Sequence, residues 1–462
     1  MYQTLEFDPE LIRRYDASGP RYTSYPTAVQ FTEAFTAARY REIAQATNTG
    51  AQAAPLSLYF HIPFCDTVCF YCACNKVITK NRKRAIPYLE QLFREIELQG
   101  ALFDRNRPVD QLHWGGGTPT FLSAEQMRDL MRVTGEHFQL RNDDSGEYSI
   151  EIDPREADAG TIAVLRSLGF NRLSLGVQDF DPDVQKAVNR IQTEAQTWAV
   201  LDAARAEGFK SVSVDLIYGL PLQTVERFMV TLDKVIAAGP DRLSVFNYAH
   251  LPQLFKTQRQ IDESLLPSAE DKLAILELTI ERLTQAGYLY IGMDHFARPD
   301  DELAVAQRQG TLYRNFQGYS THADCDLVAM GATAISKVGN SYSQNLKTLD
   351  DYAARIDSGE LAVFRGVELN ADDVLRREVI TRLICNFELD FAAIETEFNI
   401  DFTAYFADAL RALEGFAADG LLELEDRRLR VQPRGRLLIR NICMQFDRYL
   451  SGGAEQRFSK VI

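Results

Sequence analysis

L-S-L-Y-F-H-I-P-F-C-D-T-V-C-F-Y-C-A-C, residues 56–74, is the stretch that decides the fold of this chain. Its first seven residues are rich in β-forming side chains and predict a strand. A loop with four cysteines follows directly, and Cys65, Cys69 and Cys72 in it have the spacing C-x3-C-x2-C. In a reducing compartment, a thiol cluster this tight predicts a metal site rather than a disulfide framework.

The same alternation of strand and helix continues after this loop. Five β-rich runs follow, namely QLHWGG, YSIEID, RLSLGVQ, SVSVDLIYGL and RLSVFNY. Helical stretches are expected over 84–103, 123–139, 158–168, 182–207, 224–238 and 268–286. Six such units predict an α/β fold, a TIM-like parallel barrel that is complete or partial, with a further run YLYIGMDHF after the sixth helix.

Three domains are expected along the chain. Residues 1–54 form an N-terminal arm that covers the active site, with the extended stretch GPRYTSYPT and a short helix over 31–47. Residues 55–345 form the barrel, and a composition shift near 345–370 introduces a mainly helical, winged-helix-like C-terminal domain over 346–462. A winged helix also allows a DNA-binding interpretation.

Bulk composition limits the functions open to the chain. Of its 462 residues, 46% are hydrophobic and 25% are charged, and the net charge is −15. This acidity argues against nucleic acid or anionic lipid as the main partner. No membrane-spanning run or secretory signal is present, so we expect a cytoplasmic protein with no membrane partner. It is expected to be a monomer because no heptad pattern appears, and Cys325, Cys385 and Cys443 are expected to be buried thiols.

The three-cysteine motif has a specific chemical meaning. Three thiolates are one short of the four that usually hold a four-iron, four-sulfur cluster, so one iron keeps a free position. That iron can bind S-adenosylmethionine (SAM) and pass it an electron. Cys74 leaves a four-cysteine zinc site open, although zinc knuckles are usually two separated C-x2-C pairs. His61 is either a further ligand or, as its position at a strand end favours, an orienting hydrogen-bond donor or a satisfied core residue.

Polar residues and glycines stand at the ends of the later strands. Gly115, Gly116 and Gly117 either admit a ligand close to the backbone or form a tight turn. Glu151, Gln178, Asp215 and the stretch Asn247–His250 follow on successive units. Singly each is typical of a cap or surface group, but together they occupy one face of a barrel, where such enzymes build their active sites.

Taken together, these motifs resemble those of the oxygen-independent coproporphyrinogen III oxidases, which are radical SAM enzymes of haem biosynthesis. The resemblance rests on RYTSYPT, HIPFC-x3-C-x2-C-x-C, HWGGGTPT, IEIDPRE, LSLGVQDF, RLSVFNYAH, GMDHFARP and RLLIRNICM. It implies oxidative decarboxylation of two propionates of coproporphyrinogen III to vinyl groups, giving protoporphyrinogen IX. It also implies one [4Fe-4S] cluster on Cys65, Cys69 and Cys72, two SAM molecules, and an electron donor such as a flavodoxin or ferredoxin.

The resemblance assigns residues to both SAM molecules. The contacts implied for the cluster-bound molecule are Tyr59, Gly116, Glu151, Ala249 and Ile335, and those implied for the second are Tyr71, Gly117, Thr118, Gln178, Arg190 and Asp215. Tyr71 and Ala73 depart from the Phe and Gly frequent in relatives. For the substrate carboxylates, the candidates are Arg21 and Arg298, with Tyr22 and Tyr25 closing the site; the alternative is that these are surface residues.

A rival within the same resemblance is a haem-binding chaperone without oxidase activity. Such relatives typically lack the fourth cysteine of C-x-C and the RYTSYPT arm. This chain has both. The oxidase is therefore the favoured prediction.

Overall fold

The computed structural model describes residues 5–49 and 53–450. The outer ends of the predicted arm and C-terminal domain, and part of the arm's junction with the barrel, lie outside these residues. The chain forms two compact units: unit 1 comprises residues 1–29, 269–323 and 369–462, and unit 2 comprises residues 30–268 and 324–368. None of the described helices is long and apolar enough to cross a bilayer.

Unit 2 contains a parallel sheet with the strand order β9-β8-β7-β6-β4-β1-β14. The strands are β1 (Leu56–Ile62), β4 (Pro108–Gly116), β6 (Glu147–Ile152), β7 (Arg172–Gln178), β8 (Ser211–Tyr218), β9 (Arg242–Asn247) and β14 (Asp326–Met330). The first six are the six strands predicted from the sequence. The parallel, partial barrel is therefore confirmed.

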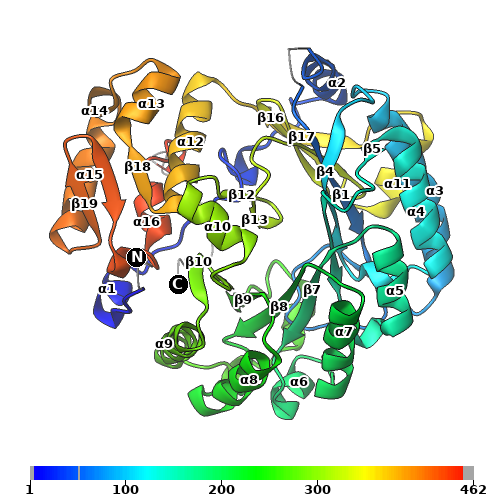
Figure 1. Cartoon of the computed structure of the whole chain (residues 1–462), viewed down its shortest axis with the longest axis horizontal. Coiled ribbons are helices and arrows are strands. Elements are labelled where there is room, and N and C mark those ends of the chain that lie inside the picture. Colours follow the sequence, from blue (N-terminus) through cyan, green and yellow to red (C-terminus); the bar gives the residue numbers. More distant parts are fainter. Residues whose placement is uncertain (1–4, 50–52, 451–462) are drawn as a thin grey trace. The chain divides into compact units, whose positions relative to one another are not determined.

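Helices alternate with these strands and lie along one face of the sheet (Figure 1). They are α3 (Ala85–Gly100), α4 (Ala124–His137), α5 (Ala159–Ser167), α6 (Pro182–Ala187), α7 (Glu194–Ala206) and α8 (Val225–Ala238). Unit 2 also contains α2 (Ala37–Ala46), α11 (Leu349–Asp357), the short strands β2 (Phe64–Cys65), β3 (Val77–Ile78) and β5 (Gln139–Leu140), and antiparallel β15 (Ile335–Val338), β16 (Ser341–Asn345) and β17 (Val363–Glu368).

Alternation along β1 explains why the sheet has an apolar and a polar face. Successive side chains of a strand point to opposite faces. Leu58 and Phe60 are fully buried, whereas Ser57 starts a polar chain on the other face. Its hydroxyl donates to Gln111 Oε1 at 2.8 Å, and Gln111 Nε2 donates to Glu147 Oε1 at 2.8 Å. The polar face therefore holds the functional side chains farther along the same strands.

Unit 1 is mainly helical and is built around a small three-stranded sheet with the order β18-β20-β19. Its helices are α1 (Pro9–Arg14), α9 (Ala269–Gln285), α10 (Glu302–Gln309), α12 (Ala371–Asn386), α13 (Phe391–Phe398), α14 (Phe402–Tyr405), α15 (Ala407–Ala418) and α16 (Ile439–Met444). Its strands are β10 (Leu289–Gly292), β11 (His295–Ala297), β12 (Tyr313–Asn315), β13 (Gly318–Ser320), β18 (Glu388–Asp390), β19 (Leu422–Glu425) and β20 (Arg428–Val431). The helix, two short strands and further helix expected near the C-terminus are present.

Two stretches are more finely divided than the sequence pattern indicates. The further run YLYIGMDHF turns at Met293 and forms β10 and β11, which pair antiparallel. The helix expected over 182–207 is two helices, α6 and α7. Asn189, with a φ of 54°, breaks it, and Thr193 caps the second helix. The domain boundaries drawn from the sequence stay predictions.

Candidate active site

The cysteine loop leaves β1 and is held by backbone contacts on both sides. The N–H of Gly117 donates to the carbonyl of Ile62, and the N–H of Thr118 to that of Phe64, both at 2.8 Å. A Cβ on Gly117 would lie 2.7 Å from the oxygen of Phe64, which no real contact shows. Gly117 is therefore required because two backbones meet at this point.

Other loops fix the far end of the same segment. Asn189 Nδ2 donates to the carbonyl of Val68 at 2.7 Å, and Gln258 Nε2 donates to that of Tyr71 at 2.9 Å. Thr257 Oγ1 and Lys76 Nζ both donate to the carbonyl of Cys72, at 3.0 and 2.8 Å. The conformation of the loop that carries the three cysteines is therefore fixed by contacts from three separate parts of unit 2.

Two guanidinium groups flank one of the predicted cluster ligands. Arg155 Nη2 and Arg190 Nη1 each lie 3.5 Å from Cys69 Sγ. Both also donate to the same carboxylate oxygen, Asp153 Oδ2, at 2.6 and 2.9 Å. Although burial opposes ionisation, the charges of Arg190 and Arg155 lower the pKa of Asp153 to about 2. This side of the site is a closed set of paired charges around a thiol.

The other thiols differ in their electrostatic setting. Burial raises the pKa of Cys65 to about 11, against a weaker lowering effect from the hydroxyl of Thr118, which is 3.5 Å from its sulfur. The thiol of Cys74 donates a hydrogen bond to Cys72, and this lowers the pKa of Cys72 to about 6. Cys74 is thus a hydrogen-bonding neighbour of a predicted cluster ligand.

His61 is oriented by two hydrogen bonds. Its Nε2 is 3.1 Å from the carbonyl of Asn75, and its Nδ1 is 3.2 Å from the hydroxyl of Tyr59. A carbonyl can only accept, so Nε2 carries the proton and Nδ1 accepts from Tyr59. Desolvation lowers the pKa of His61 and favours this neutral form. His61 is therefore a buried, neutral side chain whose two ring nitrogens both have hydrogen-bond partners.

Tyr59, His113 and Glu151 form the next layer of the polar face. The rings of Tyr59 and His113 stack with centroids 5.8 Å apart. Glu151 accepts from the N–H of Gly116 at 3.0 Å and lies 3.5 Å from His113 Nε2. Desolvation opposes ionisation of Glu151, but the hydrogen bond and charge of His113 lower its pKa overall. An ionised acceptor with its side chain 47% exposed can bind an amine or hydroxyl of a ligand.

Asp215 and Gln178 lie on the neighbouring strands, and neither is paired with a cation. Desolvation raises the pKa of Asp215 to about 6, and its carboxylate accepts from Ser174 Oγ at 2.9 Å. Gln178 has a φ of 70°, and its buried Oε1 has no hydrogen-bond partner among the described residues. The same is true of Arg190 Nε. Buried polar atoms without partners are costly unless a ligand satisfies them.

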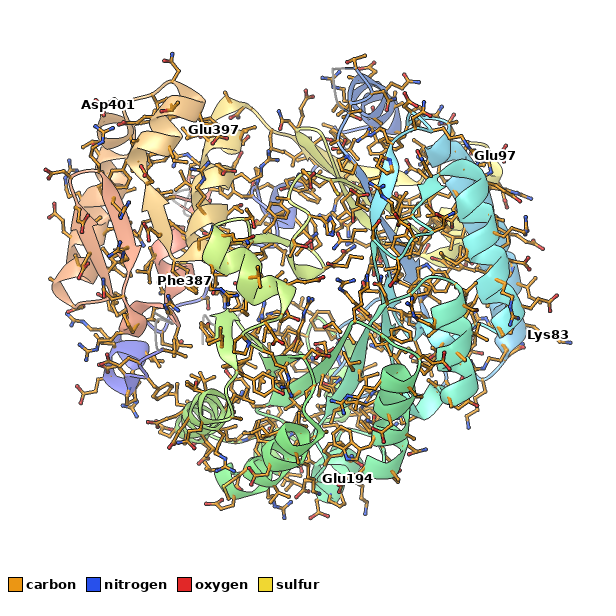
Figure 2. The ribbon with its side chains drawn as sticks, viewed as in Figure 1. Lys83, Glu97, Glu194, Phe387, Glu397 and Asp401 are labelled. Carbon is orange, nitrogen blue, oxygen red and sulfur yellow. The ribbon has the colours of Figure 1, made fainter. Side chains whose placement is uncertain are left out.

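A buried carboxyl group supports the turn that carries Ile335. Glu95 on α3 is fully buried and accepts from the N–H of Gly331 and from Asn345 Nδ2, both at 2.7 Å. It also accepts from the hydroxyl of Tyr352 at 2.6 Å. Desolvation raises the pKa of Glu95. Glu97, two residues along, points out from the same helix in Figure 2. This contrast assigns Glu95 to positioning of the turn.

The structure brings most predicted site residues to one end of the parallel sheet. These are Tyr59, Cys65, Cys69, Tyr71, Cys72, Gly116, Gly117, Thr118, Glu151, Gln178, Arg190 and Asp215, together with Ala249 and Ile335 in the following segments of unit 2. Asp153, Arg155 and His113 were missed. The motif IEIDPRE contained the first two, but strand alternation drew attention only to Glu151.

The four residues predicted to bind substrate belong to unit 1. Tyr22 is buried and donates to Asp447 at 3.0 Å, and Tyr25 is buried with its hydroxyl accepting from the N–H of Arg448 at 3.2 Å. Arg21 forms an ion pair with Asp294. The guanidinium of Arg298 lies 5.7 Å from the ring centre of Tyr288.

The donor set fits an iron–sulfur cluster with SAM. Three thiols lie on one loop, Gly117 lets the adjoining backbone approach that loop, and unpartnered polar atoms of Gln178 and Arg190 remain in the site. The model of the radical SAM superfamily matches residues 59–235, and that of the HemN C-terminal domain matches residues 369–438. Fold and site together define a radical SAM enzyme.

Full-length relatives narrow the class. The chain is 57% identical over 462 residues to an oxygen-independent coproporphyrinogen III oxidase of Pseudomonas aeruginosa, covering 100% of both chains. It is 52% identical to the Escherichia coli protein of that name, covering 100% of this chain and 99% of the relative. A solved structure, described as coproporphyrinogen III oxidase from Escherichia coli, a radical SAM enzyme, matches with a TM-score of 0.92 and 50% identity. That match covers 97% of this chain and 100% of the other. The chain belongs to the family of oxygen-independent coproporphyrinogen III oxidases.

Proposed function

We propose that this chain converts two propionate side chains of coproporphyrinogen III to vinyl groups, with loss of two carbon dioxide molecules, in haem biosynthesis. The observation that carries the proposal is the cysteine loop with its paired charges, set at one end of the partial barrel beside unpartnered Gln178 and Arg190 atoms. Full-length identity to oxidases supports it over the haem-chaperone alternative.

Each part of the loop has a role in this proposal. Cys65, Cys69 and Cys72 hold a [4Fe-4S] cluster, and when bound, the cluster and SAM together supply a 5′-deoxyadenosyl radical that abstracts hydrogen. Arg155 and Arg190 place positive charge beside Cys69, and Asp153 keeps both guanidinium groups in place. The thiol of Cys74 donates to Cys72 and completes the polar surroundings.

The polar face binds SAM. Glu151 accepts hydrogen bonds from its amine or ribose, and Asp215 binds ribose hydroxyls on the neighbouring strand. Gln178 offers Oε1 to an amine, and Arg190 offers Nε to a carboxylate. Two SAM molecules are proposed, one contacted by Tyr59, Gly116, Glu151, Ala249 and Ile335, and a second by Tyr71, Gly117, Thr118, Gln178, Arg190 and Asp215.

Substrate carboxylates are assigned to cations of unit 1. Arg21 and Arg298 are the proposed partners, and Tyr22 and Tyr25, which are buried residues of the arm, are proposed to close the site. Arg21 would exchange Asp294 for a substrate carboxylate. An Arg21→Ala protein should show a KM for coproporphyrinogen III raised more than tenfold with the deoxyadenosine yield per turnover unchanged.

The remaining assignments concern the setting of the reaction. The enzyme works as a cytoplasmic monomer, takes electrons from a flavodoxin or ferredoxin, and needs no nucleic-acid or membrane partner. The acidic composition supports the absence of a polyanionic partner. The arm, barrel and C-terminal domain keep the proposed ranges 1–54, 55–345 and 346–462.

An anaerobic assay tests the proposal. The iron-reconstituted protein is given SAM, dithionite and coproporphyrinogen III, and both 5′-deoxyadenosine and the porphyrin mass are followed. Conversion of two propionates to two vinyl groups removes two carbon dioxide molecules and four hydrogen atoms from the substrate. The proposal predicts a product lighter by this amount, with deoxyadenosine formed in proportion to it. Tight haem binding without any product would favour the chaperone instead.

A further inference from the structure

A short basic segment lies directly beside the cysteine loop. Residues 76–86, here called the basic segment, read K-V-I-T-K-N-R-K-R-A-I and hold five cations within their first nine positions. The chain as a whole carries a net charge of −15. A cluster of positive charge next to the cysteine loop is therefore unusual for this acidic protein.

The basic segment is bonded to the backbone of the predicted cluster ligands. β3 pairs with β2 so that Ile78 lies opposite Cys65. The N–H of Thr79 donates to the carbonyl of Cys65 at 2.9 Å, and Lys76 Nζ donates to that of Cys72 at 2.8 Å. One hydrogen bond therefore separates this surface from each of two cysteines.

Most of its charge is free to meet a partner. Arg82 pairs with Asp66 and Glu156, but Lys80, Lys83 and Arg84 are exposed without an ion pair within residues 5–49 and 53–450. Figure 2 shows Lys83 pointing away from unit 2 at the start of α3. Ile78 and Ile86 are 39% and 47% exposed between these cations. Exposed apolar residues among charges are typical of protein–protein contact surfaces.

The sequence at the start of α3 is unfavourable for the stability of this helix. The positive end of a helix dipole favours acidic residues and disfavours cations. α3 follows Arg82, Lys83 and Arg84, and has no acidic residue in its first turn and no side-chain cap. Four other helices of unit 2 have both a Ser or Thr cap and an acidic first turn, namely α4, α7, α8 and α11. Residues that destabilise a helix at its start indicate that a functional requirement outweighs stability at this position.

We propose that the basic segment is the docking surface for a small, acidic electron-carrier protein that reduces the cluster. This rests on the proposed function, which requires one external electron at a time. On docking, the carrier loses one electron and the cluster gains it, and no bond forms or breaks. Charge complementarity steers such an encounter, and Ile78 and Ile86 supply its apolar contact.

Stopped-flow reduction by a reduced flavodoxin tests the proposal on the full reconstituted chain. In the K80E/K83E/R84E variant, the second-order rate constant of cluster reduction should fall at least tenfold at low ionic strength. The variant should also lack the salt dependence that the wild-type rate constant shows. Turnover with dithionite should stay within twofold of wild type. I78S/I86S should lower the flavodoxin rate without changing its salt dependence.

A matched control reverses three exposed charges elsewhere, in R13E/R128E/R355E, and should keep the wild-type flavodoxin rate. A wild-type flavodoxin rate in K80E/K83E/R84E would overturn the docking proposal, as would an equal loss in the control. The proposal would also be overturned if added RNA competed for the basic segment and removed the salt effect while the flavodoxin rate stayed unchanged. No product from wild type with either reductant would instead contradict the oxidase function.

Discussion

Asp153 and Asp215 are both largely withdrawn from water at the same end of one sheet, yet their environments are opposite. Asp153 receives two guanidinium groups, and its pKa falls to about 2. Asp215 receives hydroxyl groups and no cation, and desolvation raises its pKa to about 6. The comparison separates an aspartate whose charge is already paired with cations of the protein from one whose carboxyl group has no cationic partner among the described residues.

The largest effect is expected from Asp153→Asn. A neutral amide leaves two buried guanidinium groups unpaired, so unfolding free energy at pH 7 should fall by about 3–5 kcal/mol. Because the folded pKa is lowered, this contribution is present above the ordinary pKa of 3.8 and is lost as pH falls toward 2. Chemical denaturation of both proteins at pH 7 and between pH 4 and 2 measures it.

Asp202→Asn, on an exposed position of α7, is the control and should change stability by less than about 0.5 kcal/mol. If Asp153→Asn were as stable as wild type at pH 7, the paired-charge description would be wrong.

Asp215→Asn should have the opposite sign. The folded carboxyl binds a proton between its ordinary pKa of 3.8 and about 6, so wild-type stability falls as pH rises through that range. The amide removes this penalty, and stability at pH 7 should rise by about 3 kcal/mol, with no gain below pH 4. SAM-dependent deoxyadenosine formation should fall more than tenfold. A variant that loses stability at pH 7 would place Asp215 with Asp153.

Arg155→Gln should produce the smallest effect, and this effect should be confined to the reduction potential of the cluster. Removing positive charge 3.5 Å from Cys69 Sγ disfavours the reduced cluster. At a fixed potential, the ratio of reduced to oxidised cluster should fall by up to about tenfold, equal to a shift of about 59 mV for one electron. Redox titration followed by EPR measures this shift.

Arg155→Lys should restore part of that potential because it keeps the charge. Arg82→Gln removes a loop cation that pairs with Asp66 and Glu156, and should leave the potential near wild type. Equal shifts in Arg82→Gln and Arg155→Gln would show that the effect is not specific to Cys69.

Strands with local patterns were predictable from the sequence, and those set by distant pairing were not. LSLYFHI coincides with β1 and RLSLGVQ with β7. DLVAM, which forms β14, is only five residues long and is defined by pairing with β1, some 270 positions earlier. The break between α6 and α7 depends on Asn189 in a left-handed conformation, which no periodicity records.

The site followed the same division. The cysteine spacing and the polar strand ends were visible in one dimension. The role of Arg155 was not, because it depends on a bond to Asp153 two residues away and on a sulfur 86 positions earlier. Gly117 was visible, but its reason, the oxygen of Phe64 within 2.7 Å of a Cβ, exists only in the folded chain.

EPR spectra of the reduced, reconstituted protein with and without SAM show whether the polar face holds SAM at the cluster, in wild type and in Glu151→Gln at equal SAM concentration. We expect equal iron content in both proteins, a wild-type signal that changes when SAM is added, and an unchanged signal in the variant. Loss of iron from Glu151→Gln, or a wild-type signal indifferent to SAM, would contradict this assignment.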